Sequence, residues 1–119
     1  MSRVTVEVNV VNGKIEVEQT LDLRSKPNNV RIFWTLGTTD WNFDDKGIDI
    51  VEITNQFRDA KRINGGQAYR WKDMNSDGKT YKYDINLVAA DGSGRKLALD
   101  PVIVNGGGGG DMDGGKSGA

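Results

Sequence analysis

The chain has 119 residues, a formal net charge of -1, and neither cysteine nor histidine. That length suits one domain, and the missing residue types exclude disulfides, thiolate zinc sites and histidine acid–base catalysis. The charges almost balance, so they give no long-range attraction to nucleic acid, and no apolar run approaches the ~20 residues of a membrane span. We therefore expect no nucleic-acid or membrane partner. The lack of cysteine and an N-terminus without a visible signal peptide favour a cytoplasmic location.

Alternating valines at residues 4–10 predict a first strand, because alternate side chains of a strand face the same side. The Asn12-Gly13 pair that follows is typical of a tight hairpin turn. Folding the chain at this turn pairs Val10 with Ile15, Val8 with Val17 and Val4 with Leu21. Each apolar residue then meets an apolar or neutral partner, which indicates a hairpin over residues 4–21.

A loop is expected at residues 24–29, which contain a proline and two asparagines. Alternating apolar side chains then predict a strand over residues 30–36, followed by a turn at 37–40. Trp41 and Phe43 share one face of a short strand after that turn. Their spacing is the one expected of two core aromatic residues.

Charged residues 44–46 interrupt this short strand. Residues 48–53 predict a further strand, with a bulge near Ile50-Val51 where the apolar alternation slips. The apolar residues at 50, 53, 57 and 60 fit helical spacing, but the run is short and β-branched residues are frequent upstream, so we expect residues 55–66 to form a loop that contains one helical turn.

The last third of the chain predicts a second hairpin. A strand at residues 69–71 and a polar turn at 73–79 precede the longest apolar alternation in the chain, residues 81–89. A glycine-rich turn at 91–94 then reverses the chain. This turn pairs Leu87 with Leu97 and Ile85 with Leu99.

The final strand, residues 102–104, is apolar on both faces, and Pro101 interrupts it because proline cannot donate a ladder hydrogen bond. Seven or eight short strands separated by turns are typical of an all-β protein. We therefore predict an antiparallel β-sandwich of immunoglobulin-like type over residues 1–105. Residues 106–119, which hold eight of the 16 glycines, predict a flexible glycine-rich tail.

Three residues resemble positions of the immunoglobulin and fibronectin type III superfamily. Trp34 resembles the tryptophan of that fold's third strand, while Asp77 and Tyr81 resemble the acidic turn and the corner tyrosine before its sixth strand. Tyr83 stands where the family has a cysteine, and both family cysteines are absent. The segment 81–105 is also similar to small uncharacterised bacterial β-sandwich proteins. These resemblances imply a fold and no activity.

The turn at residues 73–79 resembles the oxygen-ligand loop of a calcium site. Acidic or amide side chains stand at its first, third and fifth positions, and a glycine stands at the sixth. Its candidate ligands are the side chains of Asp73, Asn75, Asp77 and Asp84 and the carbonyl of Lys79. The alternative is a polar hairpin turn, for which the same residue types are common.

A second acidic cluster surrounds the aromatic residues of the fourth predicted strand. Carboxylates beside an aromatic platform suit carbohydrate binding or cleavage, and the alternative is a solvated loop beside two core rings. The candidate ligand-binding residues are Trp41, Phe43, Asp44, Asp45 and Trp71.

No nucleophile with a partner base and no phosphate-binding loop is visible, so we expect a protein without catalytic activity. We predict a recognition or assembly module that binds a protein partner, or a second copy of itself, through a sheet edge or loops. The alternative is a carbohydrate-binding sandwich that depends on calcium. No other cofactor is expected.

Overall fold

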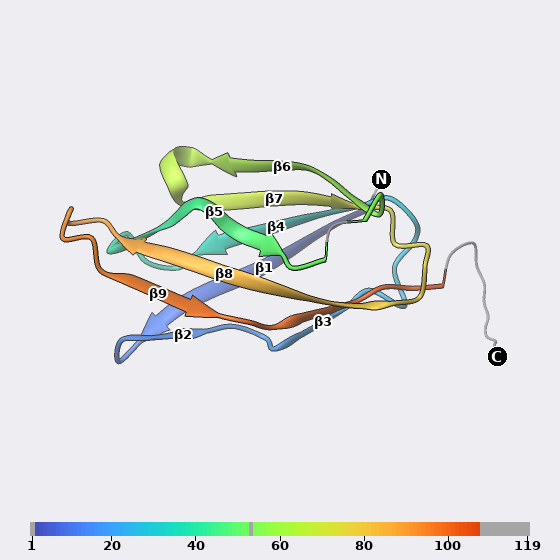
Figure 1. The fold of residues 1–119 in the computed structure, drawn as a ribbon, viewed down its shortest axis with the longest axis horizontal. Helices are drawn as coiled ribbons and strands as arrows, with labels where there is room; N and C mark the ends of the chain where they lie inside the picture. Colours follow the sequence, from blue (N-terminus) through green and yellow to red (C-terminus); the bar gives the residue numbers. More distant parts are fainter. Residues whose placement is uncertain (1, 53, 108–119) are drawn as a thin grey trace.

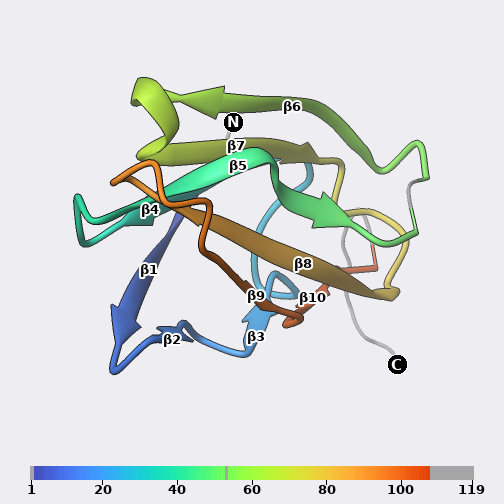
Figure 2. The ribbon, with the colours of Figure 1, turned by 60° about the vertical axis from the view of Figure 1, so that its left-hand side comes forward.

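The computed structural model describes residues 2–52 and 54–107. These residues form two β-sheets that pack face to face (Figure 1). The strands are β1 (Ser2–Val11), β2 (Lys14–Glu16), β3 (Thr20–Asp22), β4 (Val30–Leu36), β5 (Trp41–Ile50), β6 (Phe57–Ile63), β7 (Ala68–Asp73), β8 (Thr80–Ala89), β9 (Lys96–Leu99) and β10 (Val102–Val104). The strand order is β2-β1-β4-β7-β6 in the first sheet and β3-β10-β8-β5 in the second, where β9 also pairs with β8 (Figure 2). The all-β sandwich is confirmed.

The sandwich differs from the prediction in strand number and direction. It has ten strands among the described residues, and each sheet contains one parallel pair, β1 with β4 and β3 with β10. Antiparallel pairing is therefore wrong for these two pairs. Both of them join segments that are distant in the sequence, so no turn sets their register.

The first hairpin is shorter than expected. The Val10–Ile15 pair is confirmed, but β2 ends at Glu16, and the chain then crosses to the second sheet. Leu21 lies opposite Ile103 of β10, where both side chains are buried. The predicted Val4–Leu21 pair and the Val8–Val17 pair are therefore wrong, because the ladder between β1 and β2 ends at the Asn9–Glu16 pair.

The middle of the chain contains two further differences. Residues 44–46 do not end the strand: β5 continues to Ile50, and its register against β8 shifts between Phe43 and Ile48. The bulge therefore precedes Ile50-Val51. The expected loop at 55–66 is wrong over β6, whose Phe57 is buried in the core, and the single helical turn is η1 (Asn64–Gly66).

The second hairpin is confirmed in detail. Ile85 pairs with Leu99 and Leu87 with Leu97, as the turn at 91–94 predicts. Pro101 separates β9 from β10, where Ile103 is buried and its two valine neighbours are half-buried. The alternating residues of β8 all face the core, namely Tyr81, Tyr83, Ile85, Leu87 and Ala89.

Trp34 lies at the centre of the core, fully buried, and its indole N–H donates to the hydroxyl of Tyr83 across the two sheets at 3.2 Å. The two rings are 5.4 Å apart between centroids. In the described part of the chain, no helix is long and apolar enough to cross a membrane.

Candidate functional site

The outer face of the first sheet gathers basic side chains from four neighbouring strands. The core-facing residues of these strands are apolar, so the residues between them point to solvent. One cross-strand row consists of Arg3, Arg31, Lys72 and Arg58, and the next contains Phe33, Arg70 and Lys61. We call the six basic residues around Phe33 the basic face.

Neighbouring strands lie ~4.8 Å apart, so these rows place like charges side by side at a local electrostatic cost. Lys72 of this set forms an ion pair with Asp59 at 3.1 Å. The carbonyl of Asp59 also accepts a hydrogen bond from Arg70. The basic face therefore combines six basic side chains with the neighbouring acidic residue Asp59.

A bulge in β6 decides which basic residues join this face. The register between β6 and β7 shifts between Arg58 and Lys61, and Asp59 within the shift has a φ of 60°. Arg62 consequently turns the other way and donates to the carbonyl of Phe43. The three basic residues of β6 are thus divided between the two faces of the sheet: Arg58 and Lys61 lie on the outer face, and Arg62 lies on the inner face.

Phe33 provides the aromatic ring of the basic face. The guanidinium of Arg3 lies over this ring, 4.0 Å from its centroid. This cation–π contact fixes Arg3 in the row and covers one face of the phenyl ring.

The predicted aromatic binding residues lie mainly inside the sandwich. Phe43 is fully buried against Tyr69, and Trp41 is only 9% exposed. Trp71 is half-buried and contacts Phe57 edge to face. These rings therefore do not form an open platform for a sugar, and their role in ligand binding stays a prediction.

Side chains of the first sheet instead close the unpaired edge of β5. The carbonyl oxygens on this edge accept side-chain hydrogen bonds across the gap between the sheets. The donor–acceptor pairs are Gln67 to Trp41, Arg62 to Phe43, Tyr69 to Asp45 and Trp71 to Ile48, at 2.7–3.0 Å. Unpaired sheet edges can pair with strands of other chains. Because these side chains already occupy edge carbonyls of β5, this edge is a poor site for such pairing.

The acidic residues of the same region have local partners. The Asp44 carboxylate accepts from the backbone N–H of Asp45 and pairs with Lys96, and the pKa of Asp44 is lowered mainly by the first contact. Asp45 is exposed. Asp44 and Asp45 directly follow the buried residue Phe43 and lie within the bulge of β5.

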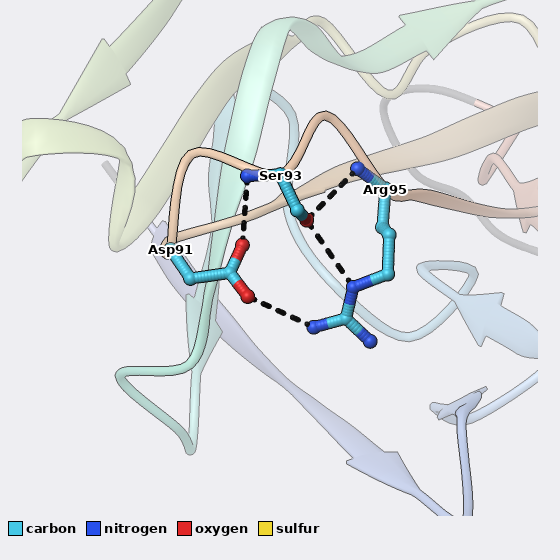
Figure 3. Close-up of polar contacts among 3 residues, drawn as sticks. All are labelled: Asp91, Ser93 and Arg95. Atoms are coloured by element: carbon cyan, nitrogen blue, oxygen red, sulfur yellow. Dashed lines mark hydrogen bonds and ion pairs between the residues drawn. The ribbon is translucent and has the colours of Figure 1, made fainter.

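The turn between β8 and β9 covers Trp41. Asp91 accepts from the backbone of Ser93 and from the guanidinium of Arg95, as Figure 3 shows. The oxygen of Ser93 in turn accepts from the backbone and side chain of Arg95. This network holds the Arg95 guanidinium over the Trp41 ring, 5.4 Å from its centroid.

Three of the predicted calcium ligands do come together, and Asn105 joins them. Asp73 and Asp77 each accept from the side-chain amide of Asn105 at 3.1 Å. Asn75 donates to carbonyls of the loop at 23–27, and its side-chain oxygen accepts from Gly106.

The last two predicted ligands lie differently. The carbonyl of Lys79 accepts the backbone N–H of Asn105, so it borders the cluster. Asp84 lies on β8 opposite Asp49 of β5, away from the turn. Among residues 2–52 and 54–107, no three His, Cys, Asp or Glu side chains are grouped to hold a metal ion.

Two features escape sequence reasoning. The basic face could be predicted only with knowledge of the strand order, although basic residues at alternate positions, such as Arg70 and Lys72, indicate that one face of their strand is basic. Asn105 lies 26 residues after the predicted turn at 73–79, and only its polar character directly after an apolar strand hints at its role.

No protein-family model matches the chain, and no curated protein matches its sequence.

Proposed function

We propose that the protein is a non-catalytic recognition module whose basic face binds an acidic segment of a protein partner. The observation that carries this proposal is the alignment of Arg3, Arg31, Lys72 and Arg58 in one row across four strands. With ~4.8 Å between strands, this row spans roughly 14 Å. An extended acidic segment that lies across the strands meets several cations within that distance.

Folding brings like charges together on the basic face. Arg31 lies opposite both Arg3 and Lys72, so folding places three basic residues side by side, where carboxylates of an acidic segment can bind. Arginine suits this role because its planar guanidinium binds a carboxylate through two hydrogen bonds. Complementary charge also raises the association rate and gives specificity.

A protein segment fits this face better than nucleic acid does. Base stacking needs an open aromatic ring, but Arg3 covers one face of Phe33, the ring of this surface. Asp59 places a carboxylate beside Lys72, where it repels a continuous phosphate backbone. The whole chain is also slightly acidic, with a net charge of -1.

Fluorescence anisotropy tests the proposal with a labelled peptide of alternating glutamate and threonine and the full chain. We expect binding in 50 mM salt that weakens about tenfold or more in 300 mM salt, because salt screens exposed charges. The double variant Arg58→Glu/Lys61→Glu reverses two charges on the basic face and is expected to weaken binding at least tenfold.

The matched control is Lys46→Glu/Lys82→Glu, which makes the same charge change at exposed strand positions of the second sheet. This control is expected to bind the peptide as the unmodified protein does. Equal losses in both variants would show that only net charge matters and would overturn the proposal. Tighter binding of a single-stranded oligonucleotide than of the peptide, lost in the Arg58→Glu/Lys61→Glu variant alone, would assign the face to nucleic acid instead.

We also infer that the sandwich is immunoglobulin-like. Trp34 and Tyr83, at the positions that the resemblance assigns to the core tryptophan and a cysteine, are in contact, but here they come from opposite sheets, whereas the corresponding strands of that fold lie in one sheet. Tyr81 donates its hydroxyl to the side-chain carboxylate of Asp77, four residues earlier, where a tyrosine corner donates to an upstream backbone group. Solution of the structure of a homologous domain with the same strand order is the test of this assignment.

A further inference from the structure

A buried polar cluster lies where β7 ends and β8 begins, beside the residue that follows β10. Asp73 and Asn105 are each 1% exposed. The side-chain amide of Asn105 donates to one oxygen each of Asp73 and Asp77, both at 3.1 Å. Because both oxygens contact the same nitrogen, the two carboxylates are neighbours within about 6 Å, twice a hydrogen-bond length.

Two oxygens of this cluster are left over. Oδ2 of Asp73 and Oδ1 of Asn105 are buried and have no hydrogen-bond partner among the described residues. Buried polar atoms are nearly always paired, so each such atom needs an explanation. A carboxylate oxygen and an amide oxygen in one cluster have the chemistry of hard-cation ligands.

The cluster also lacks a counter-charge at its deepest point. In the described part of the chain, no lysine or arginine forms an ion pair with Asp73. Burial, with a smaller contribution from the charge of Asp77, raises the pKa of Asp73 to about 6, although hydrogen bonds from Asn75 and Asn105 lower it. Buried charges in proteins are usually paired or bind a metal ion.

The surrounding backbone holds the oxygens in place. Gly78 donates to the carbonyl of Gly106, and Gly106 donates to the side chain of Asn75. Asp77 is half-buried, so the cluster reaches solvent at that residue. A cation has an approach to the cluster past the Asp77 carboxylate.

We propose that Ca²⁺ binds to Oδ2 of Asp73 and Oδ1 of Asn105, with Asp77 as the adjacent carboxylate. This site replaces the set predicted from the loop motif, because it excludes Asp84 and includes Asn105. Calcium fits better than magnesium, since it accepts irregular sets of carboxylate and amide oxygens and Mg²⁺ demands a near-ideal octahedron. The proposal is independent of the basic face.

Calorimetry of the chelator-treated full chain with CaCl₂ at pH 6 tests it. We expect a dissociation constant on the order of 10⁻⁴–10⁻³ M, since the site supplies few charged ligands. Binding is expected to release protons, measured by repeating the titration in two buffers of different ionisation enthalpy, because the cation displaces the proton of Asp73. The Tm is expected to rise with calcium.

Two variants localise the site. Asp73→Asn removes the buried charge with little change in shape and is expected to weaken calcium binding at least tenfold. Asp84→Asn removes the ligand that only the loop motif requires and is expected to leave calcium binding unchanged. If Asp73→Asn does not fold, the carboxyl ¹³C resonance of Asp73 in the unmodified protein takes its place, with a shift expected on calcium addition.

Three results would overturn the proposal. One is the absence of both heat and a Tm change at millimolar calcium, which would leave a protonated Asp73 or a buried water as the partner of the free oxygens. A second is unchanged calcium binding in Asp73→Asn, or an unmoved Asp73 resonance. The third is loss of binding in Asp84→Asn, which would assign the site to the loop motif.

Discussion

The indole N–H of Trp71 donates a 2.7 Å hydrogen bond to the carbonyl oxygen of Ile48, and so joins the two sheets across the unpaired edge of β5. Gln67, Arg62 and Tyr69 make equivalent bonds further along the same edge. Together these contacts provide the edge protection that a neighbouring strand provides elsewhere in a sheet.

Trp71→Phe tests the value of this contact. The substitution keeps an aromatic ring beside Phe57 but leaves the carbonyl of Ile48 without its donor. We expect a loss of about 1–2 kcal/mol in the free energy of unfolding, measured by urea denaturation. Tyr69→Phe, whose lost bond is to the exposed residue Asp45, is the matched control and is expected to cost less. An equal cost in both variants would contradict this account of the edge.

The Trp34–Tyr83 contact gives a second prediction. Tyr83→Phe removes the hydroxyl that accepts from the indole of Trp34, a fully buried residue, and leaves that N–H unpaired. The expected cost is about 1–3 kcal/mol of unfolding free energy. A double-mutant cycle with Trp34→Phe isolates the pair, since Tyr83→Phe is expected to cost less once the donor is absent. Strictly additive losses would show that the hydrogen bond contributes nothing.

The bulge of β5 depends on Gly47. A Cβ at this position would lie 2.5 Å from the Cβ of Phe43 and 3.0 Å from the carbonyl of Asp44. Gly47→Ala is therefore expected to destabilise the protein by about 1–3 kcal/mol through overpacking. Gly92→Ala is the comparison, because no atom lies within 4 Å of its added Cβ and only its φ of 79° opposes the change. A smaller Tm loss in Gly47→Ala than in Gly92→Ala would contradict the close packing of the bulge.

Local pairing was predictable from the sequence because a short turn sets its register. The turn at 91–94 fixes Ile85 opposite Leu99, and the Asn12-Gly13 pair fixes Val10 opposite Ile15. The parallel pairing of β1 with β4 was not predictable, since eighteen residues, 12–29, separate these strands and no turn relates them. Nothing in the apolar pattern of residues 17–21 marks the point at which the chain changes sheets.

The candidate sites show the same difference between contacts that are local in the sequence, which were predictable, and contacts between distant segments, which were not. The loop that holds Asp73 and Asp77 was visible because its residues are close in the sequence. Asn105 was missed because β8, β9 and β10 intervene before the chain returns to the loop. The basic face was hidden for the same reason, and the bulge at Asp59 reverses the direction of Arg62, which simple alternation does not foresee.

The pKa of Asp73 gives the final prediction, measured in the presence of a chelator. Burial raises this pKa from the ordinary 3.8 to about 6, so the folded protein binds a proton that the unfolded chain releases between these values. Asp73 therefore stabilises the fold fully below pH 3.8, and this contribution is lost as the pH rises through about 6. The pKa of Asp77 is lowered, because hydrogen bonds, the first from Tyr81, outweigh its burial, so its contribution is lost as the pH falls instead.

The difference in unfolding free energy between the unmodified protein and Asp73→Asn isolates the contribution of Asp73, since the other carboxylates are common to both. We expect the stability of Asp73→Asn, relative to the unmodified protein, to rise between pH 4 and pH 7 by an amount on the order of 2 kcal/mol, from a shift of about two pKa units. Urea denaturation at four pH values over this range measures it. Parallel pH profiles for the two proteins would show that the Asp73 carboxyl titrates normally and that its burial carries no electrostatic cost.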